Sequence, residues 1–209
     1  MHAETHCPLC LCRVVEHFHR TPSRRYLQCT RCELVFVVPA DLPGLEEEKT
    51  EYDRHENFPH DQGYRRFLSR LASPLMERLP AAASGLDFGC GPGPALAAML
   101  RESGYQVDLY DPFYEPDKSV LLGRYDFVCA TEVVEHLHHP GIELDLIWSL
   151  LRPGGWFGVM TKLVLSPDAF ADWHYIRYIT HVSFFSENTW RWWARKYAAH
   201  LEFVGDDVM

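Results

Sequence analysis

The sequence predicts an α/β fold in which a mostly parallel sheet carries helices on both faces, preceded by a small cysteine-rich module. From residue 84 onward, apolar stretches of strand length alternate with stretches of helical periodicity. A turn with three glycines joins the first of these strands to the first of these helices. Four of the seven cysteines form two close pairs near the start of the chain. The length of 209 residues suffices for one full domain and such a module.

The cysteine-rich module is expected at residues 1–40 as a zinc ribbon. Its pairs form the pattern C-x2-C-x18-C-x2-C, a spacing at which two knuckles close a tetrahedral four-thiolate zinc site. Four protein ligands leave no open position on the metal, so the predicted site is structural. The alternative is four ordinary buried cysteines, and Cys12 breaks the spacing. The predicted zinc ligands are Cys7, Cys10, Cys29 and Cys32.

Residues 41–81 are expected to form a connector and a helix, and residues 82–209 the main domain. The acidic segment 41–53 carries a turn signal, and helical spacing of apolar residues predicts a helix over 61–79 that Pro74 kinks or splits. In the main domain we expect strands at 85–88, 106–110, 125–130, 156–161 and 201–204, and helices at 94–102, 140–151 and 186–199, the last with Ser186 as N-cap.

Gly89, Gly91 and Gly93 lie at the turn between the first strand of the main domain and its helix. Glycines there let a ligand approach the backbone, and the following helix offers unpaired N–H groups to an anionic group. Asp111 ends the next strand, 22 residues after Gly89, where a carboxylate can accept both hydroxyl groups of a ribose. The turn therefore predicts a nucleoside-bearing cofactor. Pro94 stands where a dinucleotide fingerprint has its third glycine, which weighs against a dinucleotide.

Four motifs together carry a family resemblance: DFGCGPG, the acid in YDP, the strand YDFVCATEVVEHL and the turn LLRPGGWFGVMT. They resemble those of class I S-adenosylmethionine-dependent methyltransferases, over roughly residues 60–209. The resemblance implies a Rossmann-like sheet, S-adenosyl-L-methionine as the cofactor and transfer of a methyl group. A zinc ribbon followed by such a domain resembles a bacterial subgroup that includes sugar methyltransferases, and it is similar to the ubiquinone-type methylases.

The resemblance also implies a set of cofactor-binding residues. The residues of the glycine turn would line the methionine part of the cofactor, namely Gly89, Cys90, Gly91 and Gly93. Asp87, just before the turn, would orient the loop and the amino group, and Asp111, at the end of the second strand, would bind the ribose. Thr131 and Glu132, which follow a later strand, would close the other side of the cofactor. For Asp87 the alternative is a loop-capping carboxylate, and for Asp111 a turn residue before Pro112.

The sequence departs from the family pattern in two places. Only 14 residues separate Asp111 from Asp126, so the usual helix, third strand and acidic loop near the adenine hardly fit, and we expect at most a strand stub at 119–122. The chain also ends soon after 201–204. One of the two usual closing strands is therefore expected to be missing or to be made by residues 205–209.

Methyl transfer from a sulfonium is an in-line displacement, so the protein must align the acceptor and exclude water. A base is needed when the acceptor carries a proton. In the aromatic segment 172–186, His181 is the preferred base and Tyr175 a positioning group, while Glu135 is expected to shape the rim near the methyl group. The alternatives are a structural histidine bonded to backbone and, less favoured, a metal site in the segment EVVEHLHHP.

Composition limits the partners. The net charge is −9, and residues 41–209 carry 15 basic and 26 acidic side chains, which disfavours a general nucleic-acid binder. Without a membrane-length apolar run or a signal segment, and with an odd number of cysteines, we expect a cytoplasmic protein. The predicted function is methylation of a small molecule. The alternatives are an RNA or tRNA methyltransferase that grips its substrate with the zinc ribbon, and a noncatalytic cofactor-binding partner.

Overall fold

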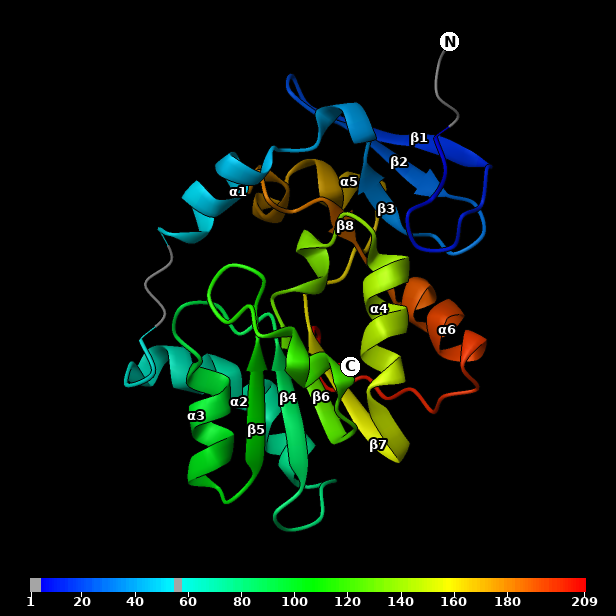
Figure 1. The fold of residues 1–209 in the computed structure, drawn as a ribbon. Helices are drawn as coiled ribbons and strands as arrows, with labels where there is room; N and C mark the ends of the chain where they lie inside the picture. The colour runs from blue at the N-terminus through cyan, green and yellow to red at the C-terminus, as the bar shows by residue number, and fades with distance from the viewer. Residues whose placement is uncertain (1–4, 55–57) are drawn as a thin grey trace. The chain divides into compact units, whose positions relative to one another are not determined.

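The computed structural model describes residues 5–54 and 58–209. The chain forms two compact units, each assembled from segments that are distant in the sequence (Figure 1). The first unit comprises Met1–Glu48, Val134–Leu144 and Thr161–Asp207, and the second comprises Lys49–Val133, Asp145–Met160 and Val208–Met209. These units cut across the boundaries expected at residues 40 and 81. The N-terminal residues share a unit with residues near the C-terminal end of the chain.

A parallel sheet with the strand order β5-β4-β6-β7 is the centre of the second unit (Figure 1). In chain order its strands are β4 (Ser84–Phe88), β5 (Gln106–Tyr110), β6 (Tyr125–Thr131) and β7 (Leu151–Met160). Asp87 lies beside Leu109 of β5 and Cys129 of β6, and all these pairs are parallel. The carboxyl ends of the strands therefore share one edge, the edge at which such sheets bind ligands. The predicted parallel α/β sheet is confirmed.

Helices α2 (Gln62–Met76) and α3 (Ala95–Glu102) belong to the same unit as this sheet. Asp61 caps α2 by accepting a hydrogen bond from the backbone N–H of Tyr64. The helix contains Pro74, is not split there, and ends at Met76 rather than at 79. It packs closely on β7, because a Cβ at Gly158 would lie 3.1 Å from Leu71 Cδ1. Two more helices, α1 (Leu45–Tyr52), inside the expected connector, and α4 (Pro140–Ser149), each contribute residues to both units.

Three segments of the main domain differ from the expectation. Residues Lys118–Leu122 form a 3-10 helix, η2, instead of a strand stub, because Asp117 caps them by accepting from Ser119 N at 2.8 Å. Residues 201–204 form no strand, and Val208 instead pairs antiparallel with Met160. The closing position is thus filled from 205–209, one of the two expected outcomes. The expected strand at 156–161 begins at Leu151, so that the RPGG turn lies within β7 as an irregularity.

The first unit contains an antiparallel sheet with the order β1-β2-β3-β8. Its strands are β1 (Val15–Arg20), β2 (Arg25–Cys29), β3 (Val35–Val37) and β8 (Ser183–Phe184). The other elements of this unit are the short helices η1 (Pro39–Asp41), η3 (Val134–His136), α5 (Pro167–Ala171) and η4 (His174–Arg177), and α6 (Glu187–Lys196), which Ser186 caps as predicted. The cysteine-rich hairpins are therefore completed by a strand from far downstream.

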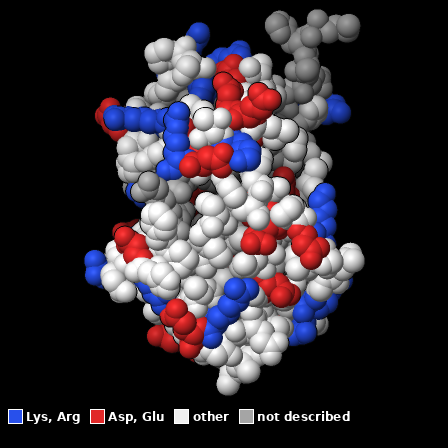
Figure 2. Space-filling model, turned by 60° about the vertical axis from the view of Figure 1, so that its left-hand side comes forward, with Lys and Arg blue, Asp and Glu red and all other residues white. Residues whose placement is uncertain are grey.

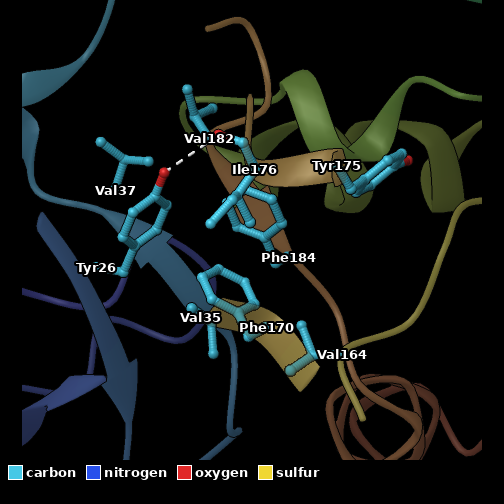
Figure 3. Close-up of a cluster of buried hydrophobic side chains, with 9 residues drawn as sticks. All are labelled: Tyr26, Val35, Val37, Val164, Phe170, Tyr175, Ile176, Val182 and Phe184. Atoms are coloured by element: carbon cyan, nitrogen blue, oxygen red, sulfur yellow. Dashed lines mark hydrogen bonds between the residues drawn. The ribbon is translucent and has the colours of Figure 1, made fainter. Parts of the chain in front are cut away.

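An aromatic core holds these distant segments together (Figure 3). Tyr26 of β2 lies edge-on to Phe170 of α5 at 5.2 Å and to Phe184 of β8 at 5.8 Å between ring centroids. The hydroxyl of Tyr26 also donates to the carbonyl oxygen of Ile176 at 3.4 Å. Burying each such ring contributes about 1.5–3 kcal/mol. The cysteine-rich segment thus folds on a core that it shares with residues 164–184.

The described helices are also informative about membranes. Within residues 5–54 and 58–209, no helix is both long enough and apolar enough to cross a bilayer. The seven cysteines are all free thiols in the structure.

Candidate functional site

The glycine turn between β4 and α3 has the backbone that the sequence predicts. Gly89 and Gly91 have φ values of 76° and 64°, a region that residues with a Cβ rarely adopt. A Cβ at Gly89 would lie 2.5 Å from Val133 Cγ2, so no larger residue fits there. The backbone N–H of Gly89 donates to the carbonyl oxygen of Tyr110 at 2.7 Å. The turn is thereby fixed to the end of β5.

Asp111 at the end of β5 holds the same turn from the other side. It is 8% exposed, and its Oδ2 accepts the backbone N–H of Gly91 at 3.0 Å. Its Oδ1 accepts the backbone N–H groups of Phe113 and Tyr114, at 2.9 and 3.2 Å. Asp111 therefore stabilises the turn with its carboxylate, which agrees with the alternative that it is a turn residue before Pro112. Since each carboxylate oxygen has two lone pairs, it keeps acceptor capacity for a ribose hydroxyl.

Asp87 lies on β4 directly before the turn, and only 3% of it is exposed. Burial raises its pKa to about 7, against the lowering effect of the Cys129 thiol and of the backbone N–H of Ala97. The Cys129 Sγ atom is 3.7 Å from Asp87 Oδ1. Tyr64 of α2 also lies in this environment, because burial, and then the charges of Asp87 and Glu132, raise its pKa to about 12. Tyr64 lies in the helix expected over 61–79 and was not among the expected site residues.

The residues at the end of β6 include a buried polar atom without a hydrogen-bond partner among the described residues. Within the described residues, the Thr131 Oγ1 atom is buried and has no hydrogen-bond partner. Glu132 has a φ of 53°, an unusual value for a residue with a side chain, and its backbone N–H donates to the carbonyl oxygen of Met160 at 2.8 Å. Buried polar atoms are normally paired, so Thr131 fits a position that a ligand completes.

Cys90 and Gly93 complete the predicted turn. The Cys90 thiol is half-buried, and burial together with the charges of Asp87 and Asp111 raises its pKa, so it stays a neutral thiol. The carbonyl oxygen of Gly93 accepts the backbone N–H of Ala95 at 2.7 Å. The N-cap residue of α3, Pro94, makes no side-chain capping bond, and Asp87 instead accepts the backbone N–H of Ala97 in the first turn. All eight predicted cofactor residues lie in the second unit.

The three predicted catalytic residues, Glu135, Tyr175 and His181, meet in the first unit. Glu135 is fully buried, and its Oε1 accepts a short hydrogen bond from the Tyr175 hydroxyl, which also lies 3.2 Å from Thr161 Oγ1. Burial raises the pKa of Glu135 to about 7, against the effect of the Tyr175 hydrogen bond. Among the described residues, the buried Glu135 Oε2 atom has no hydrogen-bond partner.

The orientation of His181 is fixed by backbone. Its Nδ1 lies 2.9 Å from the carbonyl oxygen of Tyr175, and the Nδ1 of His136 lies 3.1 Å from that of Thr180. Because a carbonyl oxygen only accepts, both rings carry a proton on Nδ1, and in the neutral imidazole Nε2 is then the acceptor. One ligand atom each from Glu135, His136 and His181 lies within 4.8 Å of the other two, so this group could also hold a cation.

The less favoured metal site in EVVEHLHHP also included His138 and His139. His138 Nε2 instead lies 2.7 Å from Glu48 Oε1 of α1, a carboxylate that is buried. The histidine that joins Glu135 and His136 is therefore His181, from a distant segment, and spacing within the motif could not reveal it.

The four predicted zinc ligands converge in the first unit. Cys7 Sγ lies 3.5 Å from Cys32 Sγ, and Cys10 Sγ lies 3.4 Å from Cys29 Sγ, with all four atoms within 4.8 Å of one another. These separations far exceed a disulfide bond of about 2.05 Å. They approach the ~3.8 Å that separates thiolates around a tetrahedral zinc at ~2.3 Å.

The two cysteine pairs also have the same backbone geometry. The residue after each pair is left-handed, with φ 58° at Leu11 and φ 59° at Glu33. Each of these residues donates its N–H to the carbonyl oxygen of the first cysteine of its pair, at 3.0 and 2.9 Å. The Cys12 thiol lies outside the cluster, 3.7 Å from the carbonyl oxygen of Val14. The donor set and the paired turns fit a four-thiolate zinc site.

Comparison with known proteins agrees with the fold. A family model described as a methyltransferase domain matches residues 54–198. The ubiquinone biosynthesis O-methyltransferase of Escherichia coli K12 is 34% identical over 85 residues, which cover 41% of this chain and 35% of that protein, and the Shigella boydii protein of the same name matches equally well. The match thus spans about a third of the length of these curated relatives.

A solved structure extends the likeness over most of the chain. It is the Burkholderia thailandensis 1,6-didemethyltoxoflavin-N1-methyltransferase with bound 1,6-didemethyltoxoflavin and S-adenosylhomocysteine. It is 18% identical to this chain, with a TM-score of 0.51 and coverage of 87% of each chain. At this level of identity the likeness shows a shared fold.

Proposed function

We propose that this chain, which belongs to the class I S-adenosylmethionine-dependent methyltransferases, methylates a small molecule. The observation that carries the cofactor assignment is the turn in which Asp111 accepts the N–H of Gly91, with left-handed glycines at 89 and 91. This turn joins an acceptor for ribose hydroxyls to a bare backbone that a ligand can approach closely. The buried Thr131 hydroxyl adds a polar atom for the ligand to pair with.

The residues divide the work of holding the cofactor. Gly89, Cys90, Gly91 and Gly93 line the methionine part, and Asp111 accepts from the ribose. Asp87 lies under the turn with a raised pKa, so a neighbouring ammonium group would stabilise its ionised form. Thr131 and Glu132 close the opposite side.

We assign proton removal to His181. When bound, the cofactor supplies an electrophilic methyl group whose carbon–sulfur electron pair stays on sulfur as the acceptor takes the methyl. His181 receives the acceptor's proton on Nε2, since Nδ1 already carries a proton directed at the Tyr175 carbonyl oxygen. Tyr175 is a positioning group, because its backbone fixes the imidazole and its hydroxyl binds Glu135. Glu135 then holds Tyr175 rather than the acceptor.

His181 has a second candidate role as a cation ligand, together with Glu135 and His136. A cation on Glu135, His136 and His181 would occupy the Nε2 lone pair that the base role needs. Turnover that needs added Mg²⁺ or Mn²⁺ would assign the cluster to a cation. Turnover that is insensitive to added cation, together with loss of activity in His181→Ala, supports the base.

The RNA alternative is weakened by how the arginines of the N-terminal module are used. Arg24 is buried, Arg25 pairs with Asp41 at 2.6 Å, and Arg31 lies over the Trp192 ring at 5.9 Å. On the face that Figure 2 shows, basic side chains alternate with acidic ones, without a basic stripe among the residues drawn in colour. Affinity for a phosphate backbone depends on Lys and Arg side chains that neutralise its charge. A small acceptor suits the net charge of −9 better.

We also propose that zinc binds Cys7, Cys10, Cys29 and Cys32 as a structural ion. Their Sγ separations and the two matched turns support this site. Four free thiols so close together suit a reducing compartment such as the cytoplasm.

Binding and turnover test the function separately. Calorimetry should give heats of binding for S-adenosylmethionine and S-adenosylhomocysteine and none for NAD. A metabolite extract supplied with methyl-labelled cofactor should then yield a labelled small molecule and S-adenosylhomocysteine. Binding without turnover in any extract would favour the noncatalytic partner, and label in RNA alone would favour the RNA methyltransferase.

A further inference from the structure

The buried guanidinium of Arg24 binds the segment that carries His181. Arg24 lies in the turn between β1 and β2 and is 8% exposed. Its Nη1 donates to the carbonyl oxygens of Tyr178 and Ile179, at 3.0 Å each, and its Nη2 donates to that of His181. A side chain of the cysteine-rich segment therefore holds three peptide groups more than 150 positions away.

One further side chain completes this arrangement. His136 donates from Nδ1 to the carbonyl oxygen of Thr180 at 3.1 Å. The four consecutive carbonyl oxygens from 178 to 181 thus all accept from side chains. The next residue, Val182, donates its N–H to the carbonyl oxygen of Glu135 at 2.8 Å. The backbone of residues 178–182 forms no helix or strand, and hydrogen bonds to Arg24 and to η3 hold it in place.

The Arg24 guanidinium is a buried charge that is stabilised by its hydrogen bonds to the segment 178–181. Burial lowers its pKa, because the guanidinium has lost water, and a buried charge is tolerated only when it is hydrogen-bonded. The hydrogen bonds of its Nη1 and Nη2 atoms go to backbone carbonyls, while the buried Nε has no hydrogen-bond partner among the described residues. The Tyr26 ring lies 5.3 Å from the guanidinium carbon and adds a cation–π contact. The planar fork of arginine can reach three carbonyls at once, which a lysine ammonium on a flexible stem cannot reproduce.

We propose that Arg24 is a positioning residue for His181, so that the cysteine-rich segment builds part of the acceptor-side chemistry rather than binding nucleic acid. The proposal rests on the proposed function for the meaning of His181, while the clamp itself is independent of it. Arg24 fixes the backbone on both sides of residue 180, and the Tyr175 carbonyl then fixes the ring. Loss of the clamp should misplace the imidazole without touching the cofactor turn.

The test compares Arg24→Lys with Arg25→Lys in the full chain. Arg25 is a matched control, since it is the adjacent arginine, its side chain is 48% exposed, and it pairs with Asp41. The first readout is the Nδ1 signal of His181 in histidine-labelled protein, assigned by its absence in His181→Gln. The second is the turnover number, measured beside the affinity for S-adenosylhomocysteine.

We expect Arg24→Lys to shift the Nδ1 signal and to lower turnover roughly tenfold or more with unchanged affinity for S-adenosylhomocysteine. Arg25→Lys should match the wild type in both readouts. An unshifted His181 signal in Arg24→Lys, or equal turnover in the two variants, overturns the proposal. Should Arg24→Lys not fold, Arg24→Gln replaces it with the same two criteria. If no acceptor is methylated even by the wild type, the proposed function fails, and the His181 signal still decides the clamp.

Discussion

Replacing Asp111 by alanine should weaken the binding of S-adenosylhomocysteine. The carboxylate accepts three backbone N–H groups, from Gly91, Phe113 and Tyr114, and it is 8% exposed. Its removal leaves the Gly91 N–H and the ribose without their acceptor, while the bond from Gly89 N–H to the Tyr110 carbonyl oxygen remains. A hydrogen bond to a charged group contributes about 1.5–3 kcal/mol. We therefore expect a loss of about 1–3 kcal/mol in binding, or a Kd raised ~5- to 150-fold.

Calorimetry with S-adenosylhomocysteine measures this loss without interference from turnover. Asp108→Asn is the matched control, because Asp108 lies on the same strand and accepts from the Tyr125 hydroxyl at 2.9 Å. The 2′-deoxy analogue of S-adenosylhomocysteine separates ribose contact from turn geometry. The wild type should bind this analogue less tightly than it binds S-adenosylhomocysteine. Asp111→Ala should bind the two compounds about equally tightly. Unchanged affinity in Asp111→Ala would refute the assignment of the ribose site.

Three further predictions concern the base, the metal and pH. His181→Ala should lower turnover by roughly 100-fold or more while S-adenosylhomocysteine still binds, as steady-state kinetics beside calorimetry would show; loss of thermal stability with normal turnover would instead make it structural. Elemental analysis of protein purified without added metal should give about one zinc per chain, falling to near zero in Cys7→Ser. The pKa of Asp87 is raised to about 7 in the folded protein, so the folded state binds the extra proton and stability should fall as pH rises from about 4 to 7. Urea unfolding should show that fall to be larger in the wild type than in Asp87→Asn, by on the order of 1–3 kcal/mol. A smaller fall should remain in the variant, because burial also raises the pKa of Glu135 to about 7.

Local patterns were sufficient to predict the strand–turn–helix unit and its acids. Glycines at 89 and 91 require left-handed backbone, and the spacing to Asp111 follows from one strand, one helix and the next strand. The cysteine pairs were equally readable, because each knuckle is a local turn. Glu135, Tyr175 and His181 were each expected near the acceptor, but no local pattern predicted the hydrogen bonds that join them across distant segments.

Long-range pairings were not readable in the same way. Nothing local in SF at 183–184 says that it pairs with β3, and this two-residue strand is fixed by the core around Tyr26 and Phe170. No local pattern marks Arg24 as buried, because its carbonyl partners lie in a distant segment. Pairing of Val208 with Met160 was one of the two outcomes expected for the closing edge, whereas the strand expected at 201–204 is reduced to one bridge residue, Val204.

The most direct test of the central claim is the fate of a labelled methyl group. The purified chain is incubated with methyl-labelled S-adenosylmethionine and an extract separated into small molecules, RNA and protein. We predict label in a small molecule, formed in equal amount with S-adenosylhomocysteine, and its loss in His181→Ala. Label confined to RNA, or no S-adenosylhomocysteine formed with any fraction despite cofactor binding, would contradict the assignment of a small-molecule methyltransferase.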